Sequence, residues 1–353
     1  MGSNVSESDT VIELKGVWKV FGANAEAALA AARAGMPKAE VLSRHNAVVG
    51  IADASFSVRR GEIFCIMGLS GSGKSTLLRH VNRLVEPSAG EVRVLGTDVR
   101  ALNDADLRRL RAERVGMVFQ NMALLPHRSV RDNVAYPLEI RREPKARRWA
   151  VSEQKLALVG LSGYEDRYPS ELSGGMQQRV GLARALASDP EVLLMDEPFS
   201  ALDPLIRREL QNQFIELSRS LNKTTLFITH DLDEAIRVGS RIAVMKDGRI
   251  MQVGAAAEIV TQPAGDYIRE FVQHISKLQF VVARSIMEPL DTLAPSPARD
   301  LSRAPTSTPD ANLDQLVALS ANQEQPIVVV DSRNIPIGVV TNRRLLTAIK
   351  DNQ

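Results

Sequence analysis

The stretch Gly68-Leu69-Ser70-Gly71-Ser72-Gly73-Lys74-Ser75-Thr76 decides which fold this chain of 353 residues adopts. It follows the apolar run 63–67 and precedes residues 77–82, which have helical character. Strand, glycine-rich loop and helix in this order are the context in which G-x-x-x-x-G-K-[ST] forms a phosphate-binding loop. The glycines let backbone N–H groups converge on a polyphosphate, and the helix N-terminus adds partial positive charge. The stretch predicts a nucleoside triphosphate site, with Lys74 reaching the β- and γ-phosphates and Ser75 ligating Mg²⁺.

The composition is that of an ordinary globular protein, with 44% hydrophobic and 24% charged residues. A formal net charge of +2 is too small to indicate nucleic acid or an acidic membrane surface as a partner. The single cysteine, Cys65, falls in an apolar run, so we expect a buried thiol and a reducing cytoplasmic compartment. No apolar run approaches the roughly 20 residues that span a membrane, and no signal-peptide pattern is visible.

Strands and helices alternate along most of the chain, which predicts an α/β domain with a largely parallel sheet. A charged, mostly helical block at residues 130–187 interrupts the alternation and predicts a helical insertion. The predicted strands are 11–17, 51–58, 63–67, 91–94, 115–119, 192–195, 224–229, 242–246 and 249–253. The other predicted helices are 23–33, a short helix ending near 44, 104–113, 204–220 and 233–238.

The composition changes after about residue 279. Residues 289–309 are rich in Pro, Ser, Thr and Ala, which predicts a linker or an open loop. Beyond this loop we expect a small α/β unit with helices at 313–319 and 342–349 and strands at 325–330 and 337–340. About 50 residues make a marginal core, so we expect the unit to pack on something else, such as its own copy.

Polar side chains follow three of the predicted strands. Asp196, after four apolar residues, is placed to hold Mg²⁺, and Glu197 to orient or deprotonate an attacking water. Gln120 is a candidate for the metal or water shell, and His230 for a contact with the γ-phosphate. The alternatives are carboxylates that only solvate a strand end and a strand-end histidine with a structural role.

A second glycine turn opens a helix at Leu172-Ser173-Gly174-Gly175-Met176-Gln177. By the same dipole argument it is a second anion site, and an ordinary glycine turn is the alternative. One chain hardly needs two phosphate sites for one triphosphate, so each turn is interpreted as one side of a nucleotide held between two chains. Phe21 or Trp18 could stack on the base, or either ring could pack in the core.

Taken together, these motifs resemble the full set of the ATPases of ABC transporters across about residues 11–273. In order they are residues 68–76, Gln120, residues 172–177, Asp196 with Glu197, residues 200–203 and His230. The resemblance implies a P-loop NTPase fold with a RecA-like core, an inserted helical subdomain at about 121–189 and an N-terminal β region. It implies binding of ATP and Mg²⁺ by two copies of the chain. Met176 stands where glutamine is commoner, which leaves the serine and both glycines in place.

The resemblance also assigns residues to roles. Ser173 and Gly175 would contact the γ-phosphate of the partner's site, Asp203 would couple the two sites, and Phe21 would stack on adenine. Residues 120–126 would lie near the coupling helix of a membrane subunit. The implied nucleotide contacts are Phe21, Gly68, Ser70, Gly71, Ser72, Gly73, Lys74, Ser75, Thr76, Ser173, Gly174, Gly175, Gln177 and Asp203. The implied catalytic residues are Glu197, His230, Gln120 and Lys74, and the implied metal ligands are Ser75, Gln120 and Asp196.

Three stretches, a helical insertion at 23–49 and residues 66–70 and 199–207, look like the ATPase subunit of osmoprotectant importers for glycine betaine, proline betaine or related quaternary amines. That likeness implies membrane permease subunits, an indirect link to a solute-binding protein, and a peripheral location on the cytoplasmic face of the membrane. Residues 283–289 with 309–349 resemble one CBS motif, which places a cassette at 1–278 and a regulatory unit at 279–353. The unit departs from the pattern, because it is a single repeat and because Arg344 stands where an acidic ribose contact often follows the threonine.

Other solutes remain open, because no residue of this chain is expected to touch the transported molecule. A soluble ABC ATPase that acts on DNA or ribosomes is disfavoured by the single cassette, the lack of a heptad array, the one cysteine and the near-neutral charge. A third interpretation gives the tail the main role, as a sensor of adenylates or ionic strength.

Overall fold

The computed structural model describes residues 9–200, 202–273, 275, 280–290, 304–321, 323 and 325–351. The chain divides into two compact units, Met1–Val253 and Gly254–Gln353. The predicted cassette boundary at 278/279 lies within the second of these units, after the last strand of the large sheet, which ends at Gly254. Residue 201 of the predicted 200–203 motif and residues 291–303 of the predicted loop lie outside the described residues.

The first sheet is antiparallel, with strand order β2-β1-β4-β5. Its two long strands pair over their whole length, from Thr10 opposite Arg59 to Phe21 opposite Val48. Both are longer than the sequence predicted, and residues 48–49 of the expected helical stretch are strand. Register shifts interrupt the alternation of apolar and polar residues that marks a strand in sequence. The strands are β1 (Thr10–Phe21), β2 (Val48–Arg59), β4 (Ala89–Val94) and β5 (Thr97–Asp98).

The second sheet has the order β10-β9-β3-β8-β7-β6, and the pairs from β9 through β6 are parallel, as predicted. Every residue of β3, β7 and β8 is buried, because a parallel sheet is covered on both faces. The strands are β3 (Ile63–Met67), β6 (Val115–Val118), β7 (Val192–Asp196), β8 (Thr224–Thr229), β9 (Arg241–Lys246) and β10 (Arg249–Gly254).

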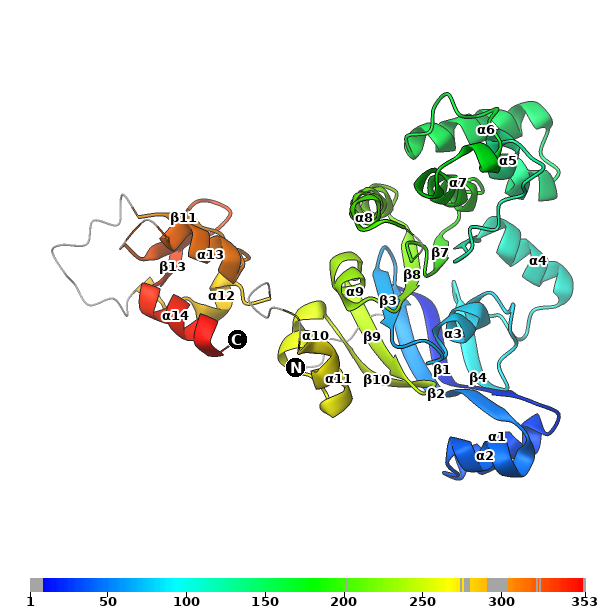
Figure 1. Cartoon of the computed structure of the whole chain (residues 1–353), viewed down its shortest axis with the longest axis horizontal. Helices are drawn as coiled ribbons and strands as arrows, with labels where there is room; N and C mark the ends of the chain where they lie inside the picture. The colour runs from blue at the N-terminus through cyan, green and yellow to red at the C-terminus, as the bar shows by residue number, and fades with distance from the viewer. Residues whose placement is uncertain are drawn as a thin grey trace. The chain divides into compact units, whose positions relative to one another are not determined.

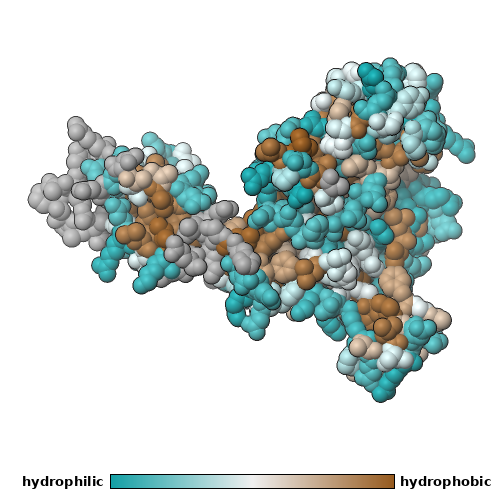
Figure 2. Space-filling model, in the orientation of Figure 1, coloured by the Kyte–Doolittle hydropathy of each residue, from teal (hydrophilic) through white to brown (hydrophobic). Residues whose placement is uncertain are grey.

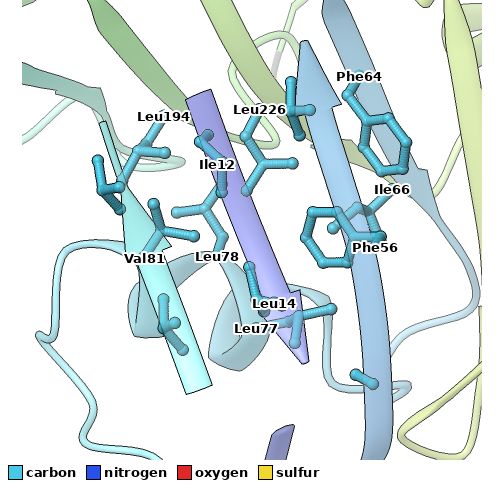
Figure 3. Packing of buried hydrophobic residues seen from close by; sticks show 14 of the residues in the cluster. Ile12, Leu14, Phe56, Phe64, Ile66, Leu77, Leu78, Val81, Leu194 and Leu226 are labelled. Carbon is cyan, nitrogen blue, oxygen red and sulfur yellow. The ribbon is translucent and has the colours of Figure 1, made fainter. Parts of the chain in front are cut away.

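The main hydrophobic core joins both sheets to helix α3 (Lys74–Val81), the helix that follows the glycine-rich loop. Ile12 and Leu14 of the first sheet lie with Leu194 and Leu226 of the second (Figure 3). The rings of Phe56 and Phe64 stack with centroids 5.0 Å apart. Each fully buried side chain of this size stabilises the fold by roughly 1.5–3 kcal/mol. The core therefore anchors α3 through Leu77, Leu78 and Val81.

The helices of the first unit form separate groups. Helices α5, α6 and α7 gather at one end of the unit, and the pair α1–α2 protrudes at the other (Figure 1). The visible surface over α5 and α6 is mainly hydrophilic (Figure 2). In the described part of the chain, no helix combines the length and apolar character that crossing a bilayer requires. The helices are α1 (Ala25–Arg33), α2 (Lys38–His45), α4 (Asp104–Glu113), α5 (Val130–Ile140), α6 (Lys145–Leu158), α7 (Gly174–Leu186), α8 (Pro204–Ser220) and α9 (Leu232–Val238).

The second unit contains a three-stranded sheet of order β11-β12-β13, with β11/β12 parallel and β12/β13 antiparallel. Its larger hydrophobic cluster runs from Val281 to Ala348 and draws on both longer helices. The predicted helix–strand–strand–helix order is confirmed. The elements are α10 (Ala256–Thr261), α11 (Asp266–Val272), α12 (Ala283–Ile286), β11 (Thr306–Ser307), α13 (Leu313–Ser320), β12 (Ile327–Val330), β13 (Pro336–Val340) and α14 (Asn342–Asp351).

Candidate nucleotide site

The glycine-rich loop connects β3 to α3, as the sequence predicted, and packs closely against its surroundings. A Cβ atom on Gly68 would lie 2.2 Å from the carbonyl oxygen of Met245. Gly73 precedes α3 with a φ of +102°, and a Cβ atom there would lie 2.8 Å from the carbonyl oxygen of Gly50. Only glycine fits these two positions. The loop tip, Ser70 and Gly71, is exposed, and Thr76 is half-buried in the first turn of α3.

Lys74 lies inside the loop. Its side chain is 4% exposed, and Nζ donates hydrogen bonds to the carbonyl oxygens of Gly68 (2.8 Å) and Leu69 (3.1 Å). Nζ is also 3.7 Å from Oε1 of Glu197. Burial lowers the pKa of Lys74, and the nearby carboxylates of Glu197 and Asp196 partly offset that shift. A phosphate group held by the loop would give this buried ammonium a further anionic partner.

Both oxygens of the Asp196 carboxylate have partners. Oδ1 accepts a hydrogen bond from Oγ of Ser75 at 2.9 Å, and Oδ2 accepts one from Nη2 of Arg79 at 3.2 Å. Asp196 is 1% exposed, at the end of β7. The Ser75–Asp196 pair was predicted as metal ligands, whereas Arg79 was missed. Arg79 lies in the last turn of α3, and nothing in its sequence context distinguishes it from other surface arginines.

Glu197 is the centre of a second group. Its Oε2 accepts a hydrogen bond from Nε2 of Gln120 at 3.3 Å and lies 2.9 Å from Nδ1 of His230. Gln120 follows β6, Glu197 follows β7 and His230 follows β8, so the carboxyl ends of three neighbouring parallel strands meet here. Lys74, after β3, joins them at 3.7 Å. The structure therefore brings together all four predicted catalytic residues.

The donor set fits Mg²⁺ with a triphosphate. Hydroxyl and carboxylate oxygens from Ser75 and Asp196 are the ligands Mg²⁺ prefers, and the ion usually takes the rest of its coordination from phosphates and water. The described residues contain no group of three or more His, Cys, Asp or Glu side chains that could hold a metal alone. Oγ of Ser72 is buried in the loop without a hydrogen-bond partner among those residues, which suits a phosphate oxygen.

The second glycine turn lies apart from this group. Ser173 caps α7 by accepting a hydrogen bond from the amide of Met176 at 3.3 Å, and Gln177 donates from Nε2 to the carbonyl oxygen of Pro169 at 3.0 Å. Ser173 and Gly174 are exposed, and Asp203 caps α8 at the amide of Leu205. In the described ranges, no hydrogen bond or ion pair joins these residues to the phosphate loop.

The two aromatic candidates have different environments. Trp18 is 7% exposed and packs in a cluster with helices α1 and α2, so its ring belongs to the core. Phe21 is 42% exposed at the end of β1, and Nζ of Lys19 lies 4.9 Å from the centroid of its ring. Of the two rings, Phe21 is the more exposed to solvent.

The sequence model of the ABC transporter family matches residues 51–200. The glycine betaine/carnitine transport ATP-binding protein GbuA of Listeria monocytogenes is 48% identical over 276 residues, covering 78% of this chain and 70% of that protein. The glycine betaine transport ATP-binding protein OpuAA of Bacillus subtilis is 46% identical over 290 residues, covering 82% and 69%. The trimethylamine N-oxide transport system ATP-binding protein TmoW of Pelagibacter ubique is 46% identical over 285 residues, covering 81% and 83%.

A solved dimer of an ATP-binding cassette in a post-hydrolysis state, bound to ADP and Pi, is similar with a TM-score of 0.59 and 30% identity, covering 69% of this chain and 98% of that one. The fold, the motifs and these relatives agree, and the chain belongs to the family of ATP-binding subunits of ABC transporters.

Proposed function

We propose that this chain hydrolyses ATP as a homodimer and thereby drives import of a quaternary or methylated amine osmoprotectant through separate membrane subunits. The convergence of Lys74, Asp196 and Glu197 at one sheet edge carries the catalytic part of the proposal. The relatives named for glycine betaine and for trimethylamine N-oxide transport support the substrate class.

Each residue of the site has a distinct role in the proposed hydrolysis. Lys74 binds the β- and γ-phosphates, while Ser75 and Asp196 hold Mg²⁺, with Gln120 in the metal or water shell. When bound, Mg²⁺ neutralises charge that develops on the phosphate oxygens. Arg79 fixes the Asp196 carboxylate by its hydrogen bond to Oδ2.

Glu197 accepts the proton of the attacking water. The hydrogen bond from Gln120 and the contact with His230 orient its carboxylate, and His230 lies where the γ-phosphate would be sensed.

The second glycine turn would complete the site of another copy. Ser173, Gly174, Gly175 and Gln177 would face the partner's ATP at the N-terminus of α7, and Asp203 would link the two sites. The exposure of Ser173, Gly174 and Asp203 supports this arrangement, as does the lack, among the described residues, of hydrogen bonds or ion pairs that join the turn to the phosphate loop of the same chain. The similar cassettes solved as dimers also support it.

An apolar cavity of about 390 Å³ borders residues 120–126 and would receive a helix of the permease. Leu84 and Ile140, which line it, are 49% and 59% exposed, so the cavity presents apolar surface to solvent. ATP-binding subunits of ABC transporters are generally peripheral to the membrane, and we place this chain on its cytoplasmic face.

Ile140→Glu tests the cavity. We expect this variant to hydrolyse ATP at the parent rate as an isolated chain and to lose co-purification with the permease, since a carboxylate must be desolvated in the apolar contact. Leu158→Glu, a similarly exposed leucine at the end of α6, is the matched control and should still co-purify. Retained assembly by Ile140→Glu would place the permease elsewhere.

Uptake measurements test the substrate class. The complete transporter, reconstituted with its permease and solute-binding protein, should accumulate labelled glycine betaine, proline betaine, choline or trimethylamine N-oxide only with ATP inside. A Glu197→Gln chain provides the inactive control. Transport restricted to an unrelated amino acid or sugar would overturn the substrate class while leaving the ATPase assignment intact.

A further inference from the structure

A cavity of about 540 Å³ lies between α2, β2 and the turn that connects β9 to β10. Trp18 forms part of its wall. Trp18 is buried in the cluster with α1 and α2, whereas Phe21 is 42% exposed at the end of β1. The cavity is therefore separate from the surface that the proposed adenine contact occupies. It belongs to the protruding α1–α2 end of the unit (Figure 1).

The cations Lys38 and Arg249 line this cavity, referred to below as the Trp18 cavity, and a third cation, Arg33, lies near the Trp18 ring. The guanidinium groups of Arg33 and Arg249 each lie 5.9 Å from the ring centroid of Trp18. Nζ of Lys38 donates a 2.7 Å hydrogen bond to the carbonyl oxygen of Val49. None of the three has an ion pair with a carboxylate within the described ranges, although many other arginines of the chain do. Asp247 is the one carboxylate on the cavity wall there.

We propose that the Trp18 cavity is a further anion site, which binds the phosphate group of a phosphate monoester. The class of ligand follows from the hydrogen-bond donors that line the cavity. The ammonium of Lys38 has three hydrogens and one assigned acceptor, and Arg249 presents a planar set of donors that matches phosphate oxygens. Trp18, Met36 and Met251 add apolar wall for the organic part of the ligand. Burial lowers the pKa of Lys38, so a bound dianion would stabilise its charged form.

The cavity is connected to the phosphate loop through Gly248. The amide of Gly248 donates to the carbonyl oxygen of Ser72 at 2.9 Å, and its carbonyl accepts from the amide of Ala52 at 2.8 Å. Nζ of Lys38 lies against the same residue, because it would be 2.9 Å from a Cβ atom there. A ligand that draws Lys38 toward the cavity therefore acts on the residue that holds the loop. Occupancy of this site is inferred to alter ATP affinity, independently of what the transporter carries.

Fluorescence of Trp18 tests binding directly. The full chain contains two tryptophans, and Trp149→Phe leaves Trp18 as the single reporter. Lys74→Ala in the same chain removes the lysine of the phosphate loop and so weakens phosphate binding at that site. Titration with glycerol 3-phosphate at constant ionic strength should give a saturable change in Trp18 emission. Lys38→Met and Arg249→Met should each weaken that binding by about tenfold, the loss expected for one charge-assisted contact.

Arg44→Met is the matched control, since Arg44 lies on the same helix and pairs with Glu40 outside the cavity. It should bind like the parent. No saturable response, or equal weakening by Arg44→Met, would overturn the site. Vesicles of phosphatidylcholine with and without phosphatidic acid, a lipid whose headgroup is a phosphate monoester, separate the two sources of such a group. A response to glycerol 3-phosphate alone identifies a soluble ester, and an additional response to phosphatidic acid identifies a lipid headgroup.

The link to the phosphate loop has its own test. In a Glu197→Gln, Trp149→Phe chain saturated with Mg-ATP, the affinity for glycerol 3-phosphate should differ by about fivefold or more from that of the Lys74→Ala chain, because coupled sites change each other's affinity reciprocally. Equal affinities would overturn the coupling. Both measurements follow binding of glycerol 3-phosphate and do not require ATP hydrolysis. A negative result for the Trp18 cavity is therefore distinguishable from a failure of the proposed ATPase function.

Discussion

At the scale of single residues, Glu197 has a backbone φ of +44°, a left-handed conformation that costs a non-glycine residue roughly 1–2 kcal/mol. Its amide donates to the carbonyl oxygen of Ile228 at 3.1 Å, which holds the residue against β8. The conformation turns the carboxylate toward Gln120 and His230. Sequence order predicted that these strand-end side chains would meet, since parallel strands end at one edge. It could not predict the left-handed turn, because glutamate has no preference for that conformation.

Glu197→Gln should retain ATP binding and lose turnover by at least about a hundredfold, the usual contribution of a positioned general base. The amide keeps the shape of the side chain but cannot take a proton from water. Nucleotide affinity and phosphate release by the same preparation measure the two effects. Glu113→Gln, at the exposed end of α4, is the control and should hydrolyse ATP normally. Normal turnover by Glu197→Gln would remove the water-activating role.

His80 makes the stability of the first unit depend on pH. Burial lowers the pKa of His80 from 6.5 to about 4, against the effect of the hydrogen bond between its Nδ1 and the carbonyl oxygen of Val85. The unfolded chain takes up a proton below pH 6.5, and the folded chain does so only near pH 4. Stability is therefore full above pH 6.5 and falls as the pH decreases to 4, by on the order of 3 kcal/mol.

His80→Gln should flatten this dependence, because glutamine does not titrate. Thermal unfolding at several pH values between 4 and 6.5 measures the slope for the parent and the variant. His127→Gln, which removes an exposed imidazole, is the control. If His80→Gln kept the slope of the parent, another group would account for acid sensitivity.

At the scale of elements, the sequence predicted α8 and β8 with their observed bounds, because periodic or continuous apolar runs end at clear breaks there. It placed the start of β2 too late, at residue 51 instead of Val48. The register shifts that relate β2 to β1 depend on the partner strand and leave no periodic signal. The contacts of Gly248 with Ser72 and Ala52 were not predicted either, since they join segments far apart in sequence through backbone atoms alone.

The N-terminus of α7 supports a prediction about the second half of the site. Ser173→Arg should abolish ATP hydrolysis and leave ATP binding by the single chain unchanged, because the bulky side chain would block the partner's nucleotide rather than its own. Ser129→Arg is the control, because it removes the equivalent N-cap from α5 and adds the same charge away from the second glycine turn. It reports the effect of losing an N-cap hydrogen bond, which costs about 1 kcal/mol of stability. Hydrolysis by Ser173→Arg at the rate of the control would contradict the ATP sandwich.

At the scale of the whole molecule, the first unit carries the phosphate loop and the second glycine turn, and the chain has a second compact unit at its C-terminal end. The motif order predicted the cassette fold, which the family match and the similar structures confirm. The unit boundary was harder to predict, because α10 and α11 are short helices without a compositional break before them. Arg344, whose position departs from the CBS pattern, forms a 2.7 Å ion pair with Glu288 inside the second unit.

A chain that ends at residue 279 should fold and hydrolyse ATP, but its ATPase rate should respond differently to salt or adenine nucleotides. The larger hydrophobic cluster of the second unit contains only residues from Val281 onward. The deletion therefore removes the whole cluster and leaves no part of it exposed to solvent. ATPase rates across a salt and AMP series measure the response. Leu345→Ala, which opens a cavity in the same cluster at a cost of about 2–5 kcal/mol, should reproduce the altered response if a folded tail is required. Identical responses of the full and shortened chains would make the tail a packing element with no regulatory role.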